Sequence, residues 1–217
     1  MKTTRILLVD NHRMFTDGLR AMLDQQEDME VVGIAEDGRT ALSMIRELSP
    51  DAVVMDITMP ELNGIEATAQ IRQSHPSVKI VCLSMHTERK YVQSMLEAGA
   101  HAYVIKESAG GELLLAVRKA MRGFKYLASD ITETVIDGYV HREVEDSSAI
   151  SQLSGREREV LQLMAEGHVS GEIASKLSLS THTVDTHRRN IMKKLDLHSV
   201  AELTKYAIRE GLTDVSG

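Results

Sequence analysis

The amino-acid sequence predicts a doubly wound α/β domain with a five-stranded parallel sheet, then a linker, then a small all-α domain of four helices. Short apolar runs bounded by polar residues recur through the first 125 residues, and such runs are typical of strands buried on both faces of a parallel sheet. Segments with apolar residues three and four apart lie between these runs, which indicates helices. We therefore expect domains at 1–125 and 151–217, joined by a partly helical linker at 126–150.

The elements of the first domain follow in a regular order. The apolar runs that predict strands lie at 5–10, 30–35, 51–56, 78–83 and 102–105. Helical spacing is clearest at 14–23, 41–48 and 113–121. An all-helical domain fits poorly, because the runs are too short and too rich in Val and Ile. One further helix is expected at 129–141, before the second domain.

Four short helices are expected in the second domain. Ser154 and Glu157 have the spacing of a capping box, and Gly167 ends the first helix. The other three helices begin at Ser170, at Ser180 or Thr181, and at Ser199. A tight turn joins the second helix to the third, which is rich in Arg and Lys. This arrangement is typical of a helix-turn-helix, whose second helix enters the DNA major groove.

The composition of the 217 residues, with 26% charged and 42% hydrophobic, is that of an ordinary globular protein and excludes a wholly disordered chain. The single cysteine, Cys82, excludes a disulfide scaffold and a four-cysteine zinc site. The apolar run before Asp10 is too short for a signal peptide, and no run approaches the ~18 residues of a membrane span. We therefore expect a cytoplasmic protein that does not contact a membrane.

The net charge of −7 is unevenly distributed along the chain. Residues 150–217 contain nine basic and nine acidic residues, so the excess of acid lies in residues 1–149. Within the neutral part, the segment 181–194 carries four Arg and Lys against one acid, Asp185. The overall charge therefore does not exclude DNA binding.

Polar side chains follow four of the predicted strands. Asp10 with Asn11, Asp56, Ser84 and Lys106 each come at a strand end. Because the carboxyl ends of parallel strands form one edge, where ligands bind, we expect these side chains to converge. Carboxylates gathered there favour Mg²⁺, and Lys106 with the Ser84 hydroxyl could stabilise a phosphoryl group on a carboxylate.

These residues and their flanking sequences resemble the receiver domain of two-component response regulators. The matching segments are Leu-Val-Asp10-Asn11-His12, Met55-Asp56-Ile-Thr-Met-Pro60 with Gly64, Leu83-Ser84, and Ala98-Gly-Ala-His-Ala-Tyr103-Val-Ile-Lys106. The resemblance, over about 3–123, implies a flavodoxin-like fold in which a sensor histidine kinase phosphorylates Asp56. It further implies that Lys106 pairs with the phosphoryl group and that Ser84 and Tyr103 form a switch pair, with Tyr103 turning inward when Ser84 moves toward the new charge. Mg²⁺ is expected at Asp10, Asn11 and Asp56, although the family usually has an acid in place of Asn11.

The second domain resembles the LuxR-type helix-turn-helix through the segments 153–161, 172–177 and 180–195, so the whole chain is similar to the NarL/FixJ class of regulators. This resemblance implies promoter DNA as a partner, a homodimer on DNA, and RNA polymerase as a further partner. Its implied base-facing residues are Asp185, Thr186 and Arg189, and its implied backbone-facing residues are Thr181, Arg188 and Lys193. The fourth helix is expected to pair two domains through Val200, Leu203 and Tyr206.

Two other functions were weighed against a phosphorylation-switched transcription regulator. A haloacid-dehalogenase-like phosphatase also phosphorylates an aspartate after a strand, but its usual general acid is an aspartate two residues later, where this chain has Thr58. The other alternative is a DNA-binding regulator controlled without phosphate, through protein or ligand contacts, and Asn11 is the residue that supports it. The chain is not expected to be an enzyme, although a receiver catalyses its own phosphorylation and dephosphorylation.

Overall fold

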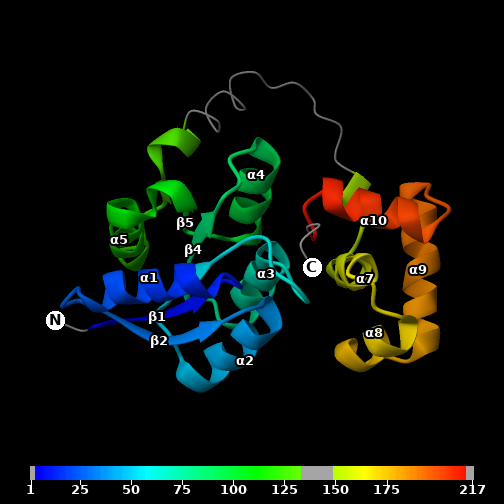
Figure 1. Ribbon diagram of the computed structural model, residues 1–217, viewed down its shortest axis with the longest axis horizontal. Helices are drawn as coiled ribbons and strands as arrows, with labels where there is room; N and C mark the ends of the chain where they lie inside the picture. Colours follow the sequence, from blue (N-terminus) through cyan, green and yellow to red (C-terminus); the bar gives the residue numbers. More distant parts are fainter. Residues whose placement is uncertain (1–2, 133–148, 214–217) are drawn as a thin grey trace. The chain divides into compact units, whose positions relative to one another are not determined.

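A computed structural model describes residues 3–132 and 149–213, which form two units considered separately below. The N-terminal unit is a parallel sheet with the strand order β2-β1-β3-β4-β5-β6 (Figure 1). Its strands are β1 (Thr4–Val9), β2 (Met29–Ala35), β3 (Ala52–Met55), β4 (Lys79–Ser84), β5 (Ala102–Ile105) and β6 (Tyr126–Leu127). Its helices are α1 (Arg13–Asp24), α2 (Gly38–Leu48), α3 (Gly64–Ser74), α4 (Arg89–Ala98) and α5 (Ala109–Met121).

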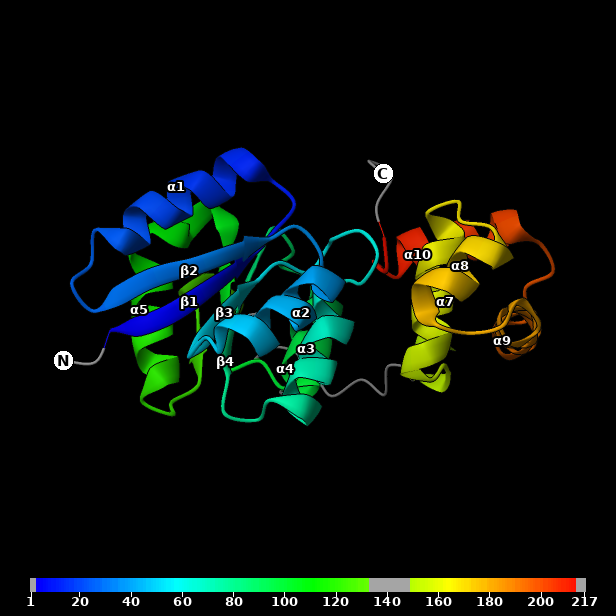
Figure 2. The same cartoon turned by 90° about the horizontal axis from the view of Figure 1, so that it is seen from below.

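Helices cover both faces of this sheet. Alternate residues of β1 point to opposite faces, so that Leu7 packs in one core and Ile6 in the other. The first core lies under α2, α3 and α4, and the second lies under α1 and α5 (Figures 1 and 2). The strands β1, β3, β4 and β5 are largely buried on both faces, which is why they are continuous apolar runs in the sequence. The predicted doubly wound α/β class is confirmed.

The sheet has six strands, not the five predicted. The sixth, β6, pairs in parallel with β5 and lies within the segment expected to be linker. Ala128 and Ile131, which follow it, are fully buried in the core of the N-terminal unit. A strand of two residues has no apolar run that could identify it, so the boundary predicted at residue 125 is too early. The helix predicted at 129–141 is helical over 129–132, and its remainder lies outside the described residues.

The C-terminal unit is helical throughout its described residues. It contains α7 (Gly155–Ala165), α8 (Ser170–Leu177), α9 (Thr181–Leu195) and α10 (Val200–Arg209), preceded by a short 3₁₀ turn, Ala149–Gln152. Ser154 and Glu157 form the predicted capping box, and the Ser180 hydroxyl accepts a hydrogen bond from the Thr183 amide at the start of α9. The four predicted helices are therefore present, with α8 and α9 as the helix-turn-helix pair. No helix among the residues described in either unit is long and apolar enough to cross a membrane.

Candidate functional site

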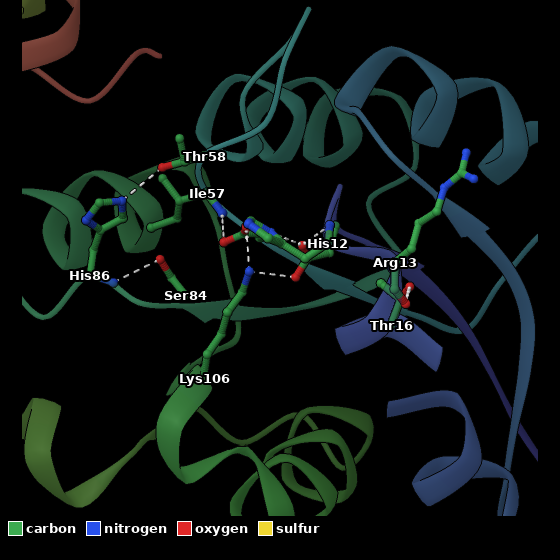
Figure 3. Close-up of polar contacts among 10 residues, drawn as sticks. His12, Arg13, Thr16, Ile57, Thr58, Ser84, His86 and Lys106 are labelled. Atoms are coloured by element: carbon green, nitrogen blue, oxygen red, sulfur yellow. Dashed lines mark hydrogen bonds and ion pairs between the residues drawn. The ribbon is translucent and has the colours of Figure 1, made fainter. Parts of the chain in front are cut away.

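Three charged side chains from three strand ends meet at the carboxyl edge of the sheet. Asp10 follows β1, Asp56 follows β3 and Lys106 follows β5, and the sheet order brings these ends together. The Lys106 Nζ lies 2.7 Å from the Asp56 Oδ2 and 2.6 Å from the Asp10 Oδ2 (Figure 3). Only 4% of Asp10 and 5% of Asp56 is exposed. The convergence expected from the strand ends is therefore present for these three residues.

Burial and the neighbouring charges set the pKa of Asp56. The other carboxylate oxygen of Asp56 accepts a hydrogen bond of 2.7 Å from the Ile57 amide. Burial raises the pKa of Asp56 to about 6 and Asp10 adds to the increase, while Lys106 acts in the opposite direction. At neutral pH the carboxylate is therefore ionised but held at a cost in free energy, which favours any change that spreads or neutralises its charge.

The backbone around Asp56 is fixed by Gly64, the first residue of α3. A Cβ atom at Gly64 would lie 1.8 Å from the Asp56 carbonyl oxygen, so only glycine permits this approach. The Asn63 side chain accepts hydrogen bonds from the Ile65 and Glu66 amides and caps the same helix. The loop after Asp56 is thereby pinned to the start of α3.

Asp10 and Asp56 supply the oxygen ligands that Mg²⁺ prefers, and their donor chemistry fits that ion. Ligand atoms of Asp10, His12 and Asp56 lie within 4.8 Å of one another. Asn11, the third predicted ligand, is exposed beside Asp10. Sequence reasoning missed His12, whose backbone N–H and ring Nδ1 both lie 2.9 Å from the Asp10 Oδ1. Its position two residues after Asp10 was the available signal.

The predicted switch pair, Ser84 and Tyr103, is fully buried. The Tyr103 hydroxyl donates to the His86 carbonyl oxygen at 2.8 Å, and the His86 amide donates to the Ser84 Oγ at 3.2 Å. Burial raises the pKa of the Tyr103 phenol, so this hydroxyl keeps its proton and remains a donor. Tyr103 lies in the inward position that the switch would give it, and its movement on phosphorylation stays a prediction.

The predicted DNA-facing residues lie along α9, and the structure distinguishes among them. Thr181, Asp185, Arg189 and Lys193 are exposed, whereas Thr186 and Arg188 are half-buried. The Ser170 hydroxyl of α8 donates to the Asp185 carboxylate at 2.9 Å, which ties the two helices together. Lys194 is the last of the four basic residues in the segment 181–194. Its Nζ donates to the Glu157 carboxylate at 2.7 Å, so this cation is paired within the domain.

The predicted dimer contacts on α10 need a correction. Leu203 has no exposed surface and Tyr206 is 8% exposed, and both belong to the core of the C-terminal unit. Val200, at 40% exposure, is the one member of the predicted set that a partner could reach in this structure. The same apolar stripe cannot fill the domain core and form an open interface, and here it fills the core.

Comparison with known proteins agrees with this geometry. Residues 6–118 match the response regulator receiver domain, and residues 151–207 match the luxR family of bacterial regulatory proteins. The chain is 37% identical to the oxygen regulatory protein NreC of Staphylococcus haemolyticus, over 97% of this chain and 99% of that protein. It is also 37% identical to the transcriptional regulatory protein MctR of Rhizobium johnstonii, over 98% of this chain and 97% of that protein.

Solved structures of full-length regulators are similar as well. The RcsB response regulator of Salmonella typhimurium is 27% identical, with a TM-score of 0.61 over 95% of this chain and 98% of that one. An RcsB–DNA complex is 26% identical, with a TM-score of 0.59 over 94% of this chain and 98% of that one. The chain therefore belongs to the two-component response regulators, as a transcription regulator with a receiver domain and a LuxR-type DNA-binding domain.

Proposed function

We propose that phosphoryl transfer from a sensor histidine kinase to Asp56 switches dimerisation and promoter binding of this regulator. The observation that carries the proposal is the position of the Lys106 ammonium between the Asp56 and Asp10 carboxylates. A cation held there neutralises charge where a phosphoryl group would form. The raised pKa of Asp56 supports the same role, since the buried carboxylate gains from such neutralisation.

In the proposed transfer, an Asp56 carboxylate oxygen attacks phosphorus. A P–O bond forms as the P–N bond of the kinase phosphohistidine breaks, and the released imidazole stays on the kinase. Lys106 neutralises the developing charge, and the Ser84 hydroxyl donates a hydrogen bond to a phosphoryl oxygen. Mg²⁺, which Asp10 and Asp56 would hold with the Asn11 amide nearby, would neutralise phosphoryl oxygens when bound. The receiver residues thus promote both gain and loss of the phosphoryl group on their own side chain.

The output is sequence-specific DNA binding by a homodimer. Asp185, Thr186 and Arg189 would face bases, while Thr181, Arg188 and Lys193 would contact the DNA backbone. The exposure of Arg189 and Lys193 supports these roles. One related structure describes two RcsB dimers bound to two parallel DNAs, which supports a dimer of this chain on its promoter. RNA polymerase is the proposed further partner at the promoter.

A second candidate is control without phosphate. One observation favours it: Asn11 lacks the charge that strengthens Mg²⁺ binding. Under this reading the DNA-binding domain has the same role, and protein or ligand contacts replace phosphorylation as the input.

One experiment separates the two candidates. The full chain is incubated with acetyl phosphate across a Mg²⁺ series, and phosphoprotein and promoter-fragment binding are measured together. Asp56→Asn removes the acceptor, Asp17→Asn is the control at an exposed carboxylate, and Asn11→Asp restores a charge at the metal site. We expect labelling of the wild type and Asp17→Asn but not of Asp56→Asn, tighter DNA binding on labelling, and a Mg²⁺ requirement about tenfold lower in Asn11→Asp. An unlabelled wild type that binds DNA as tightly as Asp56→Asn would reject the phosphate mechanism and favour the second candidate.

A further inference from the structure

One peptide group lies between the two members of the switch pair. The His86 N–H donates to the Ser84 Oγ at 3.2 Å, and the His86 carbonyl oxygen accepts from the Tyr103 hydroxyl at 2.8 Å. The Ser84 hydroxyl, having accepted this bond, still has its own proton to donate. The main chain of His86 therefore orients Ser84 as a donor and holds Tyr103 as a buried ring at the same time.

The exposed Glu88 carboxylate lies 3.7 Å from the Nδ1 of the His86 imidazole ring, and two further contacts fix the ring. Its Nε2 is hydrogen-bonded to the Thr58 Oγ1 at 2.9 Å, and Thr58 lies two residues after the acceptor Asp56 (Figure 3). The ring also stacks on Tyr91 in α4, with centroids 4.0 Å apart and the planes inclined by 23°. These contacts join the loop after β3, the loop after β4 and helix α4 through one side chain.

From these contacts we infer that His86 is a positioning residue, whose ring keeps its own peptide group in place and thereby keeps Tyr103 inside. The ring contacts the loop that carries the acceptor, while the peptide contacts both switch side chains. A movement of Thr58 or Tyr91 is therefore passed through the His86 ring and its peptide group to Ser84 and Tyr103. The meaning of this link for signalling rests on the proposed phosphorylation switch, but the position of Tyr103 does not.

The test measures the solvent access of Tyr103 in the Asp56→Asn variant, which lacks the proposed phosphoryl acceptor. The full chain, which has five tyrosines, is labelled with 3-fluorotyrosine, and Tyr103→Phe identifies the signal of residue 103 by its loss. Solvent access is measured as the extra ¹⁹F relaxation caused by a dissolved paramagnetic agent. A failure of the phosphorylation proposal leaves this measurement unchanged.

The variants separate the two contacts of the ring. His86→Phe keeps an aromatic ring on Tyr91 and loses the hydrogen bond, His86→Gln keeps a hydrogen-bonding group toward Thr58 and loses the stack, and His86→Ala loses both. Thr58→Val removes the same hydrogen bond from the other side. His75→Ala is the matched control, because His75 is likewise hydrogen-bonded to a hydroxyl, that of Ser74 at 2.9 Å, but is not joined to the switch pair.

We expect the relaxation of the Tyr103 signal to increase about fivefold in His86→Ala and less in His86→Phe and His86→Gln, because one contact remains in each. His75→Ala leaves the signal unchanged. Thr58→Val combined with His86→Phe is no worse than His86→Phe alone, since both substitutions remove the hydrogen bond between Thr58 and His86. The inference is overturned if Tyr103 is as protected in all the His86 variants as in the parent, or if the Thr58 and His86 effects simply add. His86→Phe and His86→Gln decide the matter if His86→Ala fails to fold.

A second readout measures the signalling consequence on the chain with Asp56 intact. We expect His86→Phe to weaken promoter binding of the unphosphorylated protein about fivefold, and Thr58→Val to match it. The phosphorylated forms lose less, because the phosphoryl group supplies a new partner for Ser84. Equal losses in both forms would show a purely structural role for His86 and would overturn the link.

Discussion

Lys106 is held between two buried carboxylates, with its Nζ 2.7 Å from Asp56 and 2.6 Å from Asp10, so that one cation partly neutralises two acids. The triad of Asp10, Asp56 and Lys106 therefore carries one more negative charge than positive charge. Burial makes this excess costly, because water does not screen the two carboxylates from each other. The site is thus arranged so that a bound cation lowers its free energy.

Lys106→Met leaves two buried carboxylates without the lysine cation between them. We expect a loss of about 3 kcal/mol in the free energy of unfolding at neutral pH, measured by urea denaturation of the full chain. The loss becomes smaller at pH 5, because Asp56 then takes up a proton. Lys119→Met, at an exposed position on α5, is the control and remains near the wild type. A destabilisation by Lys106→Met that does not depend on pH would contradict this account.

The raised pKa of Asp56 predicts the direction of a pH effect. The pKa moves from 3.8 in the unfolded chain to about 6 in the folded one, so the folded state binds more protons between these values. Stability from this group therefore falls as the pH rises from about 4 to about 7, by about 3 kcal/mol. Asp56→Asn should be more stable than the wild type at pH 7 and lose this advantage at pH 4. A difference between the two proteins that stays constant with pH would disprove the assignment.

Gly64→Ala tests the packing behind the acceptor. The new methyl group would meet the Asp56 carbonyl oxygen, so either that peptide or the start of α3 must move. We expect a destabilisation of about 3 kcal/mol and slower phosphorylation of Asp56, measured by thermal unfolding and by labelling with acetyl phosphate. Gly110→Ala is the control, because nothing lies within 4 Å of its Cβ position. Normal labelling of Gly64→Ala would show that the acceptor loop tolerates the shift.

The cations of α9 should differ in their effect on the salt dependence of DNA binding. Lys193→Ala lowers the slope of log affinity against log salt by about 0.9, because it removes one phosphate contact, whereas Arg189→Ala relaxes the preference for the promoter sequence. Lys194→Ala leaves the slope unchanged and destabilises the domain, since Lys194 is paired with Glu157. Arg122→Ala, exposed on the N-terminal unit, is the control for net charge. A slope lowered by Lys194→Ala as much as by Lys193→Ala would show that the ion pair of Lys194 and Glu157 opens on DNA.

Substitutions at Leu203 and Val200 distinguish the folding of the C-terminal unit from the pairing of two chains through α10. Leu203→Ala empties part of the core of the C-terminal unit and should cost about 3 kcal/mol of stability. Val200→Ala changes stability by less than about 0.5 kcal/mol, because the side chain is partly exposed. If α10 pairs two chains, Val200→Ala weakens dimerisation on promoter DNA, as measured by sedimentation of the complex. Unchanged dimerisation in Val200→Ala would move the interface elsewhere.

Much of the fold and the central triad could be predicted from local sequence. The strands β1 and β3 to β5 are apolar runs, and each of the four ends at a residue of the predicted site. Once the sheet is parallel, topology alone brings Asp10, Asp56 and Lys106 together. The strand β6 escaped prediction because two residues carry no periodicity, and its pairing with β5 depends on tertiary packing.

Contacts between distant residues could not be predicted in this way. His86 is hydrogen-bonded to Thr58, 28 residues away in the sequence, and Lys194 to Glu157, 37 residues away. Neither contact could be predicted from a local sequence pattern. Leu203 shows the opposite difficulty, because an apolar stripe on a helix predicts burial without saying whether the domain or a partner buries it. These contacts depend on where side chains lie in the folded domain, which sequence spacing does not specify.

The inward position of Tyr103 affects how strongly phosphorylation can change promoter binding. A modification shifts a two-state equilibrium only by its differential free energy for the two states. If the contacts of His86 hold Tyr103 inward at all times, less of that equilibrium is left for phosphorylation to shift. We therefore expect appreciable background promoter occupancy and a modest fold-response to each stimulus, so that transcription follows the cellular amount of this regulator as well as its phosphorylated fraction.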